Sequence, residues 1–274
     1  MMELAALAQA SGGDIVQLYA AAVSGDMNRT GSIFLFMEPA SATLHNAMAV
    51  YGIPKAHKIR MLVEILRGLR RLEEAGFVHS DVKSNNILVF GDPMEEGLHA
   101  KLSDFGHARL LSELRPAKNA ALIGAPGYIA PEAWMGRGWQ GKVDVWSAGI
   151  VAFELFVGQF PSSLRLHEPN GSSVPLEQHP FREYVPKHFK IRQDSRFQEF
   201  REEDRELASF IESMLRKCVW RRPSIRDALA RAQRLATSRG IPCPEQPIDT
   251  GFEEVVEEIM WRARDCRPQK KDAQ

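Results

Sequence analysis

One short polar stretch decides the fold of this 274-residue chain: HSDVKSNN at residues 79–86, which runs directly into the apolar residues ILV at 87–89. Asp81 and Lys83 are separated by one residue, and Asn86 follows shortly after them. A carboxylate can orient an attacking hydroxyl, an ammonium group can meet a transferring phosphoryl group, and an amide oxygen can bind Mg²⁺. The pattern therefore indicates phosphoryl transfer. The plainer interpretation is a polar turn between two strands.

Two further motifs follow this stretch. SDFG at 103–106 places a second carboxylate after a short strand, where it could hold the same metal ion, and APE follows at 130–132. In this order and spacing, the three motifs resemble the eukaryotic protein kinases. The resemblance extends to DVWSAG at 144–149 and RPS at 222–224, and it covers about residues 3 to 235. It implies an α+β kinase-like fold, with a remnant N-lobe of one helix and about two strands and a mainly helical C-lobe.

The resemblance implies a role for each polar residue of these motifs. Asp81 is expected to be the catalytic base and Lys83 to contact the phosphate. Asn86 and Asp104 are expected to be the metal ligands, so ATP and Mg²⁺ are the implied cofactors. Lys83 at its position resembles serine/threonine kinases more than tyrosine kinases, which implies a protein substrate with a serine or threonine hydroxyl.

An adenine pocket and a structural frame are implied in the same way. The residues implied to line the pocket are Met37 as the gatekeeper, Glu38 and Ala40 as hinge backbone groups, and Leu88 as the apolar floor. Asp144 is expected to brace the backbone of the catalytic loop. Glu132 and Arg222 are expected to form a buried ion pair. This pair would tie the activation segment, the stretch between Asp104 and Glu132, to the C-lobe.

The N-terminal part of the family pattern is incomplete in this sequence. Two strand-like segments, 14–23 and 32–38, precede the catalytic stretch, and no glycine-rich loop or V-A-I-K lysine stands before them. Glu3 lies where the family has the glutamate of its third helix, which pairs with that lysine at the nucleotide. The residues that fit the apolar stack of an active kinase are Leu7, Leu18, His79 and Phe105.

Two explanations of this pattern are open. The chain is either a fragment or truncated product of a working kinase, starting at an internal methionine, or a shortened pseudokinase that serves as a scaffold for protein partners. We favour the first because every downstream catalytic residue type is present. The lysine normally clamps the phosphates and the glycine-rich loop shields them from water. We therefore expect weak or no ATP turnover from this polypeptide alone.

Three substitutions within the family pattern concern activation and substrate binding. Ser80 replaces the usual arginine before the catalytic aspartate, whose role is to receive an activation-loop phosphate. Ala121 stands about where the phosphoacceptor would be expected. Donor and acceptor are lost together, so we expect activation without loop phosphorylation. Ala125 replaces the threonine that usually contacts the aspartate and the lysine, which weakens the assignment of a hydroxyl substrate and favours the pseudokinase.

Apolar periodicity and turn residues predict the remaining elements. Helices are expected at 2–10, 55–76, 143–158, 204–219, 224–238 and 252–264, whereas residues 161–200 carry little pattern. The predicted boundaries are a remnant N-lobe and hinge at 1–40, a kinase C-lobe at 41–238 and a C-terminal extension at 239–274. The helix at 252–264 either packs back on the C-lobe or docks a protein partner.

Composition excludes several classes of protein. Lys plus Arg and Asp plus Glu each number 35, a formal net charge of zero, which argues against a strongly basic nucleic-acid binder. Three scattered cysteines indicate free thiols in a reducing compartment. No segment is long and apolar enough for a membrane span, and the N-terminus does not read as a signal peptide. We expect a cytoplasmic protein, with access to the nucleus, that binds neither nucleic acid nor membrane.

Two weaker patterns concern side-chain clusters. Arg67, Arg70 and Arg71 are interleaved with glutamates, so we expect a solvated helix face with ion pairs. The tryptophans expected to pack within the C-lobe are Trp134, Trp139, Trp146 and Trp220.

Overall fold

The computed structural model describes residues 2–24, 32–91, 97–113, 124–135, 141–158, 161 and 189–246. Its helices are α1 (Met2–Ala10), α2 (Leu44–Val50), α3 (Lys55–Glu74), α4 (Pro131–Trp134), α5 (Lys142–Val157), α7 (Ser195–Glu203), α8 (Arg205–Met214) and α9 (Ile225–Ser238). Its strands are β1 (Leu18–Ser24), β2 (Ser32–Met37), β3 (Ala42–Thr43), β4 (Phe77–Val78), β5 (Ile87–Phe90), β6 (His99–Leu102) and β7 (Arg109–Leu110). Short 3₁₀ turns are η1 (Ser84–Asn86), η2 (Leu111–Glu113), η3 (Pro126–Tyr128), η7 (Ile191–Gln193) and η8 (Val219–Arg221).

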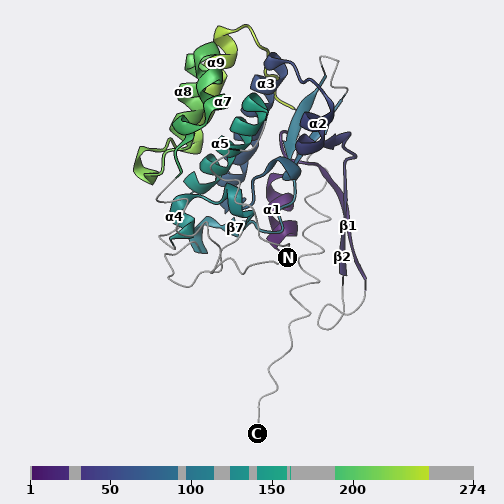
Figure 1. Cartoon of the computed structure of the whole chain (residues 1–274). Helices are drawn as coiled ribbons and strands as arrows, with labels where there is room; N and C mark the ends of the chain where they lie inside the picture. Colours follow the sequence, from purple (N-terminus) through teal and green to yellow (C-terminus); the bar gives the residue numbers. More distant parts are fainter. Residues whose placement is uncertain are drawn as a thin grey trace, which may run out of the picture.

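These elements form the α+β arrangement expected from the sequence. In Figure 1 the hairpin β1–β2 runs along one side of the molecule, the helices α7, α8 and α9 lie on the other, and α5 lies between them. No helix in the described ranges is long and apolar enough to cross a membrane.

Helix α1 and the hairpin β1–β2 make up the N-terminal part, as predicted, but the first strand starts later than expected. Strands β1 and β2 pair antiparallel, with Ala21 opposite Leu35. The predicted strand began at residue 14, whereas β1 begins at Leu18, because Ile15 is fully buried and bridges Leu102 of β6 instead. The Val16 amide donates to the Leu102 carbonyl at 2.9 Å. This contact attaches the N-terminal part to the strand that leads into SDFG.

Two small sheets carry the polar motifs. Strands β3, β5 and β6 form one sheet in that order, and β4 pairs with β7 in the other. Because Ile87 of β5 lies opposite Leu102 of β6, the next residues outward, Asn86 and Ser103, meet at the end of this sheet. The catalytic stretch and SDFG are therefore neighbours in space.

Helix α5 is the centre of the helical part. Its residues from Val143 to Leu155 are all buried, as its nearly continuous apolar sequence predicts. It ends at Gly158, whose φ of 82° is a left-handed conformation that favours glycine. At Gly149 a Cβ atom would lie 2.9 Å from Leu215, so glycine permits this close approach of the segment after α8.

Helix α7 was not predicted, because residues 161–200 show little apolar periodicity. The helix begins after Asp194, whose carboxylate accepts the backbone N–H groups of Arg196 and Phe197. Two aromatic residues supply its packing. Phe197 stacks on Phe153 of α5, with ring centroids 5.5 Å apart, and Phe200 stacks on Phe156. Two aromatic contacts thus replace the longer apolar stripe that sequence patterns detect.

The prediction that the arginines of α3 lie on a solvated face with ion pairs is wrong for two of the three. Arg70 does pair with Glu73 and Glu74. Arg67 instead binds the buried carboxylate of Asp14, and Arg71 donates to the Ser11 carbonyl. Both therefore hold the N-terminal segment against α3.

The tryptophan prediction is confirmed in part. Trp134 and Trp146 are buried, whereas Trp220 is 76% exposed because it lies on the outer turn η8. Trp139, Ala121 and the predicted helix at 252–264 lie outside the described residues.

Candidate active site

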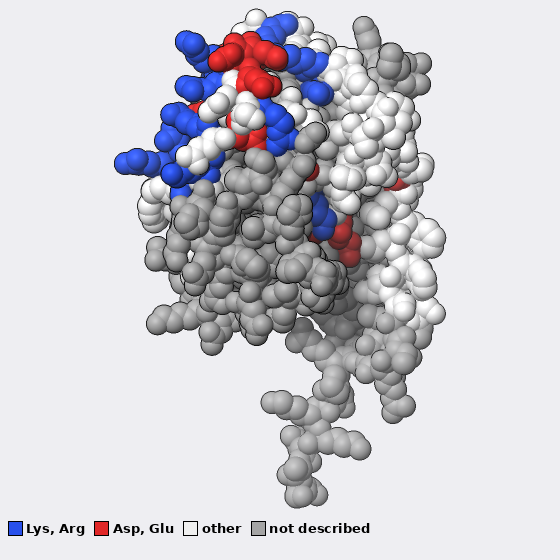
Figure 2. Space-filling view, viewed as in Figure 1, with Lys and Arg blue, Asp and Glu red and all other residues white. Residues whose placement is uncertain are grey.

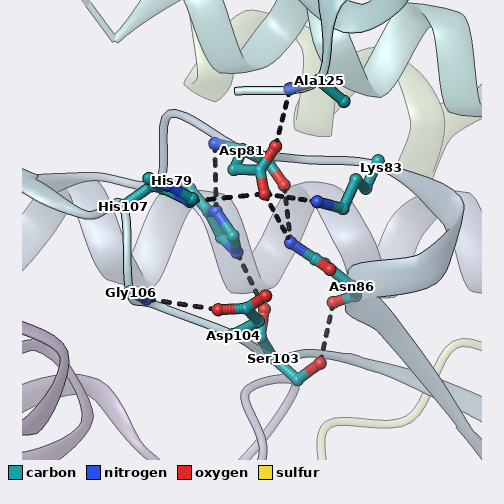
Figure 3. Close-up of polar contacts among 9 residues, drawn as sticks. All are labelled: His79, Asp81, Lys83, Asn86, Ser103, Asp104, Gly106, His107 and Ala125. Atoms are coloured by element: carbon teal, nitrogen blue, oxygen red, sulfur yellow. Dashed lines mark hydrogen bonds and ion pairs between the residues drawn. The ribbon is translucent and has the colours of Figure 1, made fainter. Parts of the chain in front are cut away.

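Asp81 is the centre of the polar contacts drawn in Figure 3. Its Oδ2 atom accepts a hydrogen bond from Lys83 Nζ at 2.6 Å and another from Asn86 Nδ2 at 3.0 Å. Its Oδ1 atom accepts the backbone N–H of Ala125 at 2.9 Å. His107, which sequence reasoning did not single out, places Nδ1 3.5 Å from Oδ2. The carboxylate is thus held at both oxygens.

The spacing of Asp81, Lys83 and Asn86 follows from a turn that closes on itself. The Asn86 amide nitrogen Nδ2 also donates to the Asp81 carbonyl at 3.0 Å, and the Asn86 backbone N–H donates to the Lys83 carbonyl at 2.9 Å. The turn η1 lies between them. These bonds gather the three side chains that the sequence placed in one motif.

Asp144 supports the start of this loop, as predicted. Its carboxylate accepts the backbone N–H of His79 at 2.8 Å and that of Ser80 at 3.0 Å. Burial raises the pKa of this carboxyl to about 7. Asp144 is therefore a brace whose charged form depends on those two N–H groups.

The buried ring of His79 links the catalytic stretch at 79–86 to SDFG at 103–106. Its Nδ1 lies 3.4 Å from the Asp81 backbone N–H, and its Nε2 lies 3.1 Å from the Ser103 carbonyl. These partners assign the neutral tautomer with the proton on Nε2, and burial lowers the pKa of the ring in agreement. The four residues of the predicted apolar stack are all buried, and the rings of His79 and Phe105 lie 4.9 Å apart.

Two residues of these motifs hold a rare backbone conformation. Ser80 has a φ of 68° and Asp104 a φ of 60°, and no other non-glycine residue of the described ranges has a positive φ. Such backbones cost about 1–3 kcal/mol and persist where the surroundings impose them. Strain of this kind gathers at functional sites, and here it falls on one residue in each of the two motifs that His79 links.

Asp104 and Asn86 offer oxygen ligands of the type that Mg²⁺ requires. Ser103 fixes their relation, because its N–H and its hydroxyl both donate to the Asn86 carbonyl at 2.9 Å. Asn86 turns its Nδ2 towards Asp81, which leaves its amide oxygen for a cation, and Asp104 is exposed. One amide and one carboxylate oxygen beside a phosphate are a donor set that fits Mg²⁺. No group of three or more His, Cys, Asp or Glu side chains that could hold a metal ion is found in the described ranges.

Glu3 lies beside SDFG. Burial, and then the charge of Asp104, raise its pKa, while a hydrogen bond from the Phe105 backbone opposes the shift. In the described part of the chain no basic side chain forms an ion pair with it. Glu3 thus lies close to Asp104 and Phe105, where the helix α1 meets SDFG.

The four predicted adenine-pocket residues lie along the connection from β2 to β5. Met37 ends β2, Leu88 lies in β5 opposite Lys101, and Glu38 and Ala40 are half-buried between them. The Glu38 N–H donates to the Gln17 carbonyl at 3.0 Å. No hydrogen bond to the Ala40 N–H is formed within the described residues.

Lys101 fixes this connection and was missed by sequence reasoning. Its Nζ binds both carboxylate oxygens of Glu38, at 2.7 and 2.9 Å, and lies 5.1 Å from the centre of the Phe90 ring. Glu38 Oε1 also accepts the Gln17 backbone N–H at 2.7 Å. A lysine inside an otherwise apolar strand, in HAKL at 99–102, was the signal that could have found it.

Tyr128 joins the activation segment to the catalytic loop and to α5. Its hydroxyl donates to Glu154 Oε2 at 2.7 Å and lies 3.2 Å from the Ser84 hydroxyl. Burial raises the pKa of Glu154 to about 7. The Ser147 hydroxyl donates to the Tyr128 carbonyl at 2.8 Å.

Glu132 and Arg222 form the predicted buried ion pair. Two nitrogens of Arg222 contact the two carboxylate oxygens of Glu132, at 2.5 and 2.9 Å. Arg222 is 1% exposed, and it also donates to the carbonyls of Lys142 and Arg216. The pair therefore ties α4 to α5 and to the segment after α8.

Comparison with known proteins identifies the family to which this chain is similar. A model of the protein kinase domain matches residues 1–232. A probable serine/threonine-protein kinase of Dictyostelium discoideum is 34% identical over 110 residues, 40% of this chain and 20% of its own length. A putative tyrosine-protein kinase of Caenorhabditis elegans is 36% identical over 107 residues, 39% of this chain and 31% of its own length.

A third relative matches over a longer segment. The serine/threonine-protein kinase zyg-8 of Caenorhabditis elegans is 33% identical over 162 residues, 58% of this chain and 19% of its own length. The chain therefore spans 19% to 31% of the length of these three relatives.

Proposed function

The chain belongs to the protein kinase family, and from this premise we propose that it transfers the γ-phosphate of ATP to serine or threonine hydroxyls of proteins. The observation that carries the proposal is the fixed carboxylate of Asp81. Lys83, Asn86 and the Ala125 backbone hold its two oxygens from three directions. This is the arrangement that a base needs if it is to meet a hydroxyl in one defined orientation.

In the proposed reaction the substrate hydroxyl oxygen bonds to the γ-phosphorus while the bond from that phosphorus to the β–γ bridging oxygen breaks. The hydroxyl proton passes to a carboxylate oxygen of Asp81, and ADP leaves with the bridging oxygen. The Lys83 ammonium group, 2.6 Å from Asp81 Oδ2, would balance negative charge on the transferring group. Asp81 and Lys83 are thus the proposed catalytic residues.

We propose Asn86 and Asp104 as ligands of Mg²⁺. The ion, when bound, neutralises charge on the phosphate oxygens. Glu3, whose carboxylate meets the Phe105 backbone, is proposed to position Asp104. Support for these assignments comes from the oxygen donors that Ser103 brings together.

The adenine is proposed to bind between β2 and β5. The N–H of Ala40 and the carbonyl of Glu38 would supply its hydrogen bonds, and Met37 and Leu88 its apolar walls. Lys101 supports this assignment, because it holds the Glu38 side chain away from the ligand.

A pseudokinase scaffold is the second candidate, and position 125 favours it. Ala125 carries no hydroxyl to contact the substrate, so only its backbone meets Asp81. In this alternative the surface of the C-lobe binds protein partners and no phosphate is transferred.

A phosphotransfer assay with radiolabelled ATP and a generic protein acceptor tests the proposal. We expect slow transfer by the 274-residue polypeptide, which carries no V-A-I-K lysine or glycine-rich loop, and a loss of about 10²–10⁴-fold on Asp81→Asn. Glu199→Gln, on the exposed face of α7, is the matched control and should leave the rate unchanged. A rate that Asp81→Asn leaves intact would overturn the proposal.

Nucleotide-dependent stabilisation separates the two candidates if the transfer rate falls below detection. A ligand at 100 times its dissociation constant adds about 2.7 kcal/mol to the free energy of unfolding. A raised melting temperature with Mg-ATP supports the kinase, whereas no shift favours the scaffold.

Three broader assignments accompany the proposal. We place the division between N-lobe and C-lobe near residue 40 and the start of the C-terminal extension near 239. We propose the cytoplasm as the compartment, because the scattered cysteines fit reduced thiols. A protein partner at the extension is proposed from the apolar side of its predicted helix.

A further inference from the structure

The neutral net charge of the chain hides an uneven distribution. Figure 2 shows lysine and arginine side chains gathered over the part of the molecule that Figure 1 assigns to α7, α8 and α9, with fewer acidic side chains among them. The three helices themselves carry six arginines and six acidic residues, whereas residues 189–246 as a whole carry 13 lysines and arginines against 9 acidic residues. The excess positive charge therefore lies in the segments that flank the helices, which include Lys190, Arg192, Arg216 and Lys217. Concentrated charge of one sign steers and binds partners of the opposite sign.

A groove of about 400 Å³ lies within this surface. Its apolar lining residues are Phe189, Ile191 and Leu215, each less than 9% exposed. Its basic lining residues are Lys190, Arg192, Arg216 and Lys217, and all four are exposed. The groove thus has an apolar floor and a basic rim.

The rim carries excess positive charge. Among the described residues that line the groove, Glu212 alone carries a carboxylate, and Arg192 already binds both of its oxygens, at 3.0 and 2.6 Å. No carboxylate of the described residues pairs with Lys190 or Arg216. These two cations are therefore available to an acidic ligand.

A second hollow of about 320 Å³ shares Arg192 with the groove and adds Arg201 and Arg205, together with one carboxylate, that of Glu202. Two hollows that meet at one residue suit an extended segment of a partner better than a single small molecule. Together they provide a depression for one bulky side chain and basic groups on either side of it.

The groove is also rigidly placed relative to the candidate active site. The Arg216 carbonyl accepts two hydrogen bonds from Arg222, at 3.1 and 3.0 Å, and Arg222 binds Glu132 at the end of the activation segment. A segment bound in the groove would therefore be held at a fixed position relative to α4.

We propose that this groove binds an extended acidic segment of a partner protein that carries one bulky apolar side chain. The apolar side chain occupies the floor formed by Phe189, Ile191 and Leu215. Carboxylates of the same segment pair with Lys190 and Arg216 on the rim. This binding requires no phosphate transfer, so it stands whether the chain is a kinase or a scaffold.

A peptide-binding experiment on the whole chain tests the proposal. The probe is a fluorescein-labelled peptide with one phenylalanine flanked on each side by three glutamates, followed by fluorescence anisotropy. We expect saturable binding, weakened about five-fold by Lys190→Glu and by Arg216→Glu, since each reversal turns one ion pair into a repulsion. Arg234→Glu, on the exposed face of α9 and outside the groove, is the matched control. It should change the affinity less than two-fold, because salt screens the effect of a distant charge on the peptide.

Two further probes examine the floor and the class of partner. Replacing the peptide's phenylalanine by alanine should weaken binding about ten-fold, because the apolar contact is lost. Oligo(U) RNA and phosphatidylserine vesicles should bind more weakly than the peptide. The proposal is overturned if the peptide does not bind, if the alanine peptide binds equally well, or if Arg234→Glu matches the groove variants. Tighter binding of RNA or vesicles, released by the same reversals, would also overturn it.

Discussion

Gly124 and Ala125 hold the Asp81 carboxylate through backbone atoms alone. Gly124 has a φ of 109°, and a Cβ atom at this position would lie 2.7 Å from the Ser80 carbonyl oxygen. The close approach brings the next N–H, that of Ala125, to 2.9 Å from Asp81 Oδ1. The backbone thus supplies a contact to Asp81 at a position that carries no side-chain hydroxyl.

Gly124→Ala should disrupt this contact. The added methyl group meets the Ser80 backbone, and the left-handed φ of residue 124 is unfavourable for alanine. We therefore expect a loss of about 1–3 kcal/mol in the free energy of unfolding. Displacement of the Ala125 N–H should lower phosphotransfer by at least about ten-fold. Urea unfolding and the radiolabel assay measure the two effects.

Gly97→Ala is the matched control for this substitution. A Cβ atom at Gly97 meets nothing within 4 Å, so the stability should change by no more than about 0.5 kcal/mol. Equal effects of the two substitutions would show that the approach of Gly124 to Ser80 is unimportant.

Three elements meet at the Tyr128–Glu154 contact: the turn η3, the turn η1 through Ser84, and the helix α5. A carboxyl whose pKa is about 7 in the folded chain and 4.5 otherwise binds more protons when folded. Stability therefore falls as the pH rises from about 4.5 to 7. Burial raises the pKa of Glu64 and of Asp144 to about 7 as well, so these carboxyls act in the same direction.

Glu154→Gln should flatten this dependence. The amide cannot ionise but can still accept a hydrogen bond from the Tyr128 hydroxyl. Between pH 5 and pH 8 the free energy of unfolding should therefore fall by about 2–3 kcal/mol less in the variant than in the unmodified chain. Chemical unfolding at the two pH values measures the difference. The control Glu199→Gln should show the same pH dependence of the free energy of unfolding as the unmodified chain. If Glu154→Gln showed that same dependence too, the assignment of Glu154 would be contradicted.

The ion pair between α4 and the segment after η8 should matter more than any surface pair. Glu132→Ala leaves the buried guanidinium of Arg222 without its counter-ion, so we expect a loss of about 3–5 kcal/mol. Glu74→Ala removes one exposed partner of Arg70 and should cost less than about 1 kcal/mol. Thermal unfolding of both variants gives the comparison, and a small loss for Glu132→Ala would refute the structural role.

Elements with strong local signals could be predicted, and those made by distant contacts could not. The even apolar stripe of α3 and the motif at 79–86 were readable because their residues are close in sequence. Helix α7 depends on rings from α5, and the start of β1 depends on Leu102, neither of which leaves a local pattern. In the candidate site, the position of Lys101 in a strand is a local signal, but its partner could not be predicted, because Glu38 lies far away in sequence.

At the scale of the whole molecule, Arg67 connects three parts of the chain that are distant in sequence. From its place on α3 it donates to the Asp14 carboxylate, with Nη2 to Oδ1 at 2.8 Å, and to the carbonyls of Cys243 and Pro244 at 3.2 and 2.9 Å. Asp14 is the residue whose carbonyl accepts the Leu102 N–H. The N-terminal part, α3 and the residues after α9 are thus joined at one guanidinium.

Arg67→Lys should loosen this junction although it keeps the charge. An ammonium group cannot reproduce the planar fork that reaches a carboxylate and two carbonyls at once, so we expect a loss of about 1–3 kcal/mol in the free energy of unfolding. Because Asp14 adjoins the bridge to β6, the Val16 and Leu102 amides should also exchange hydrogen faster. Arg70→Lys, on the same helix but with one half-buried and one exposed glutamate partner, should cost less than about 0.5 kcal/mol and leave both amides protected. If the two substitutions had equal effects, the N-terminal part would be held by its other contacts, and Arg67 would be only one more ion pair of α3.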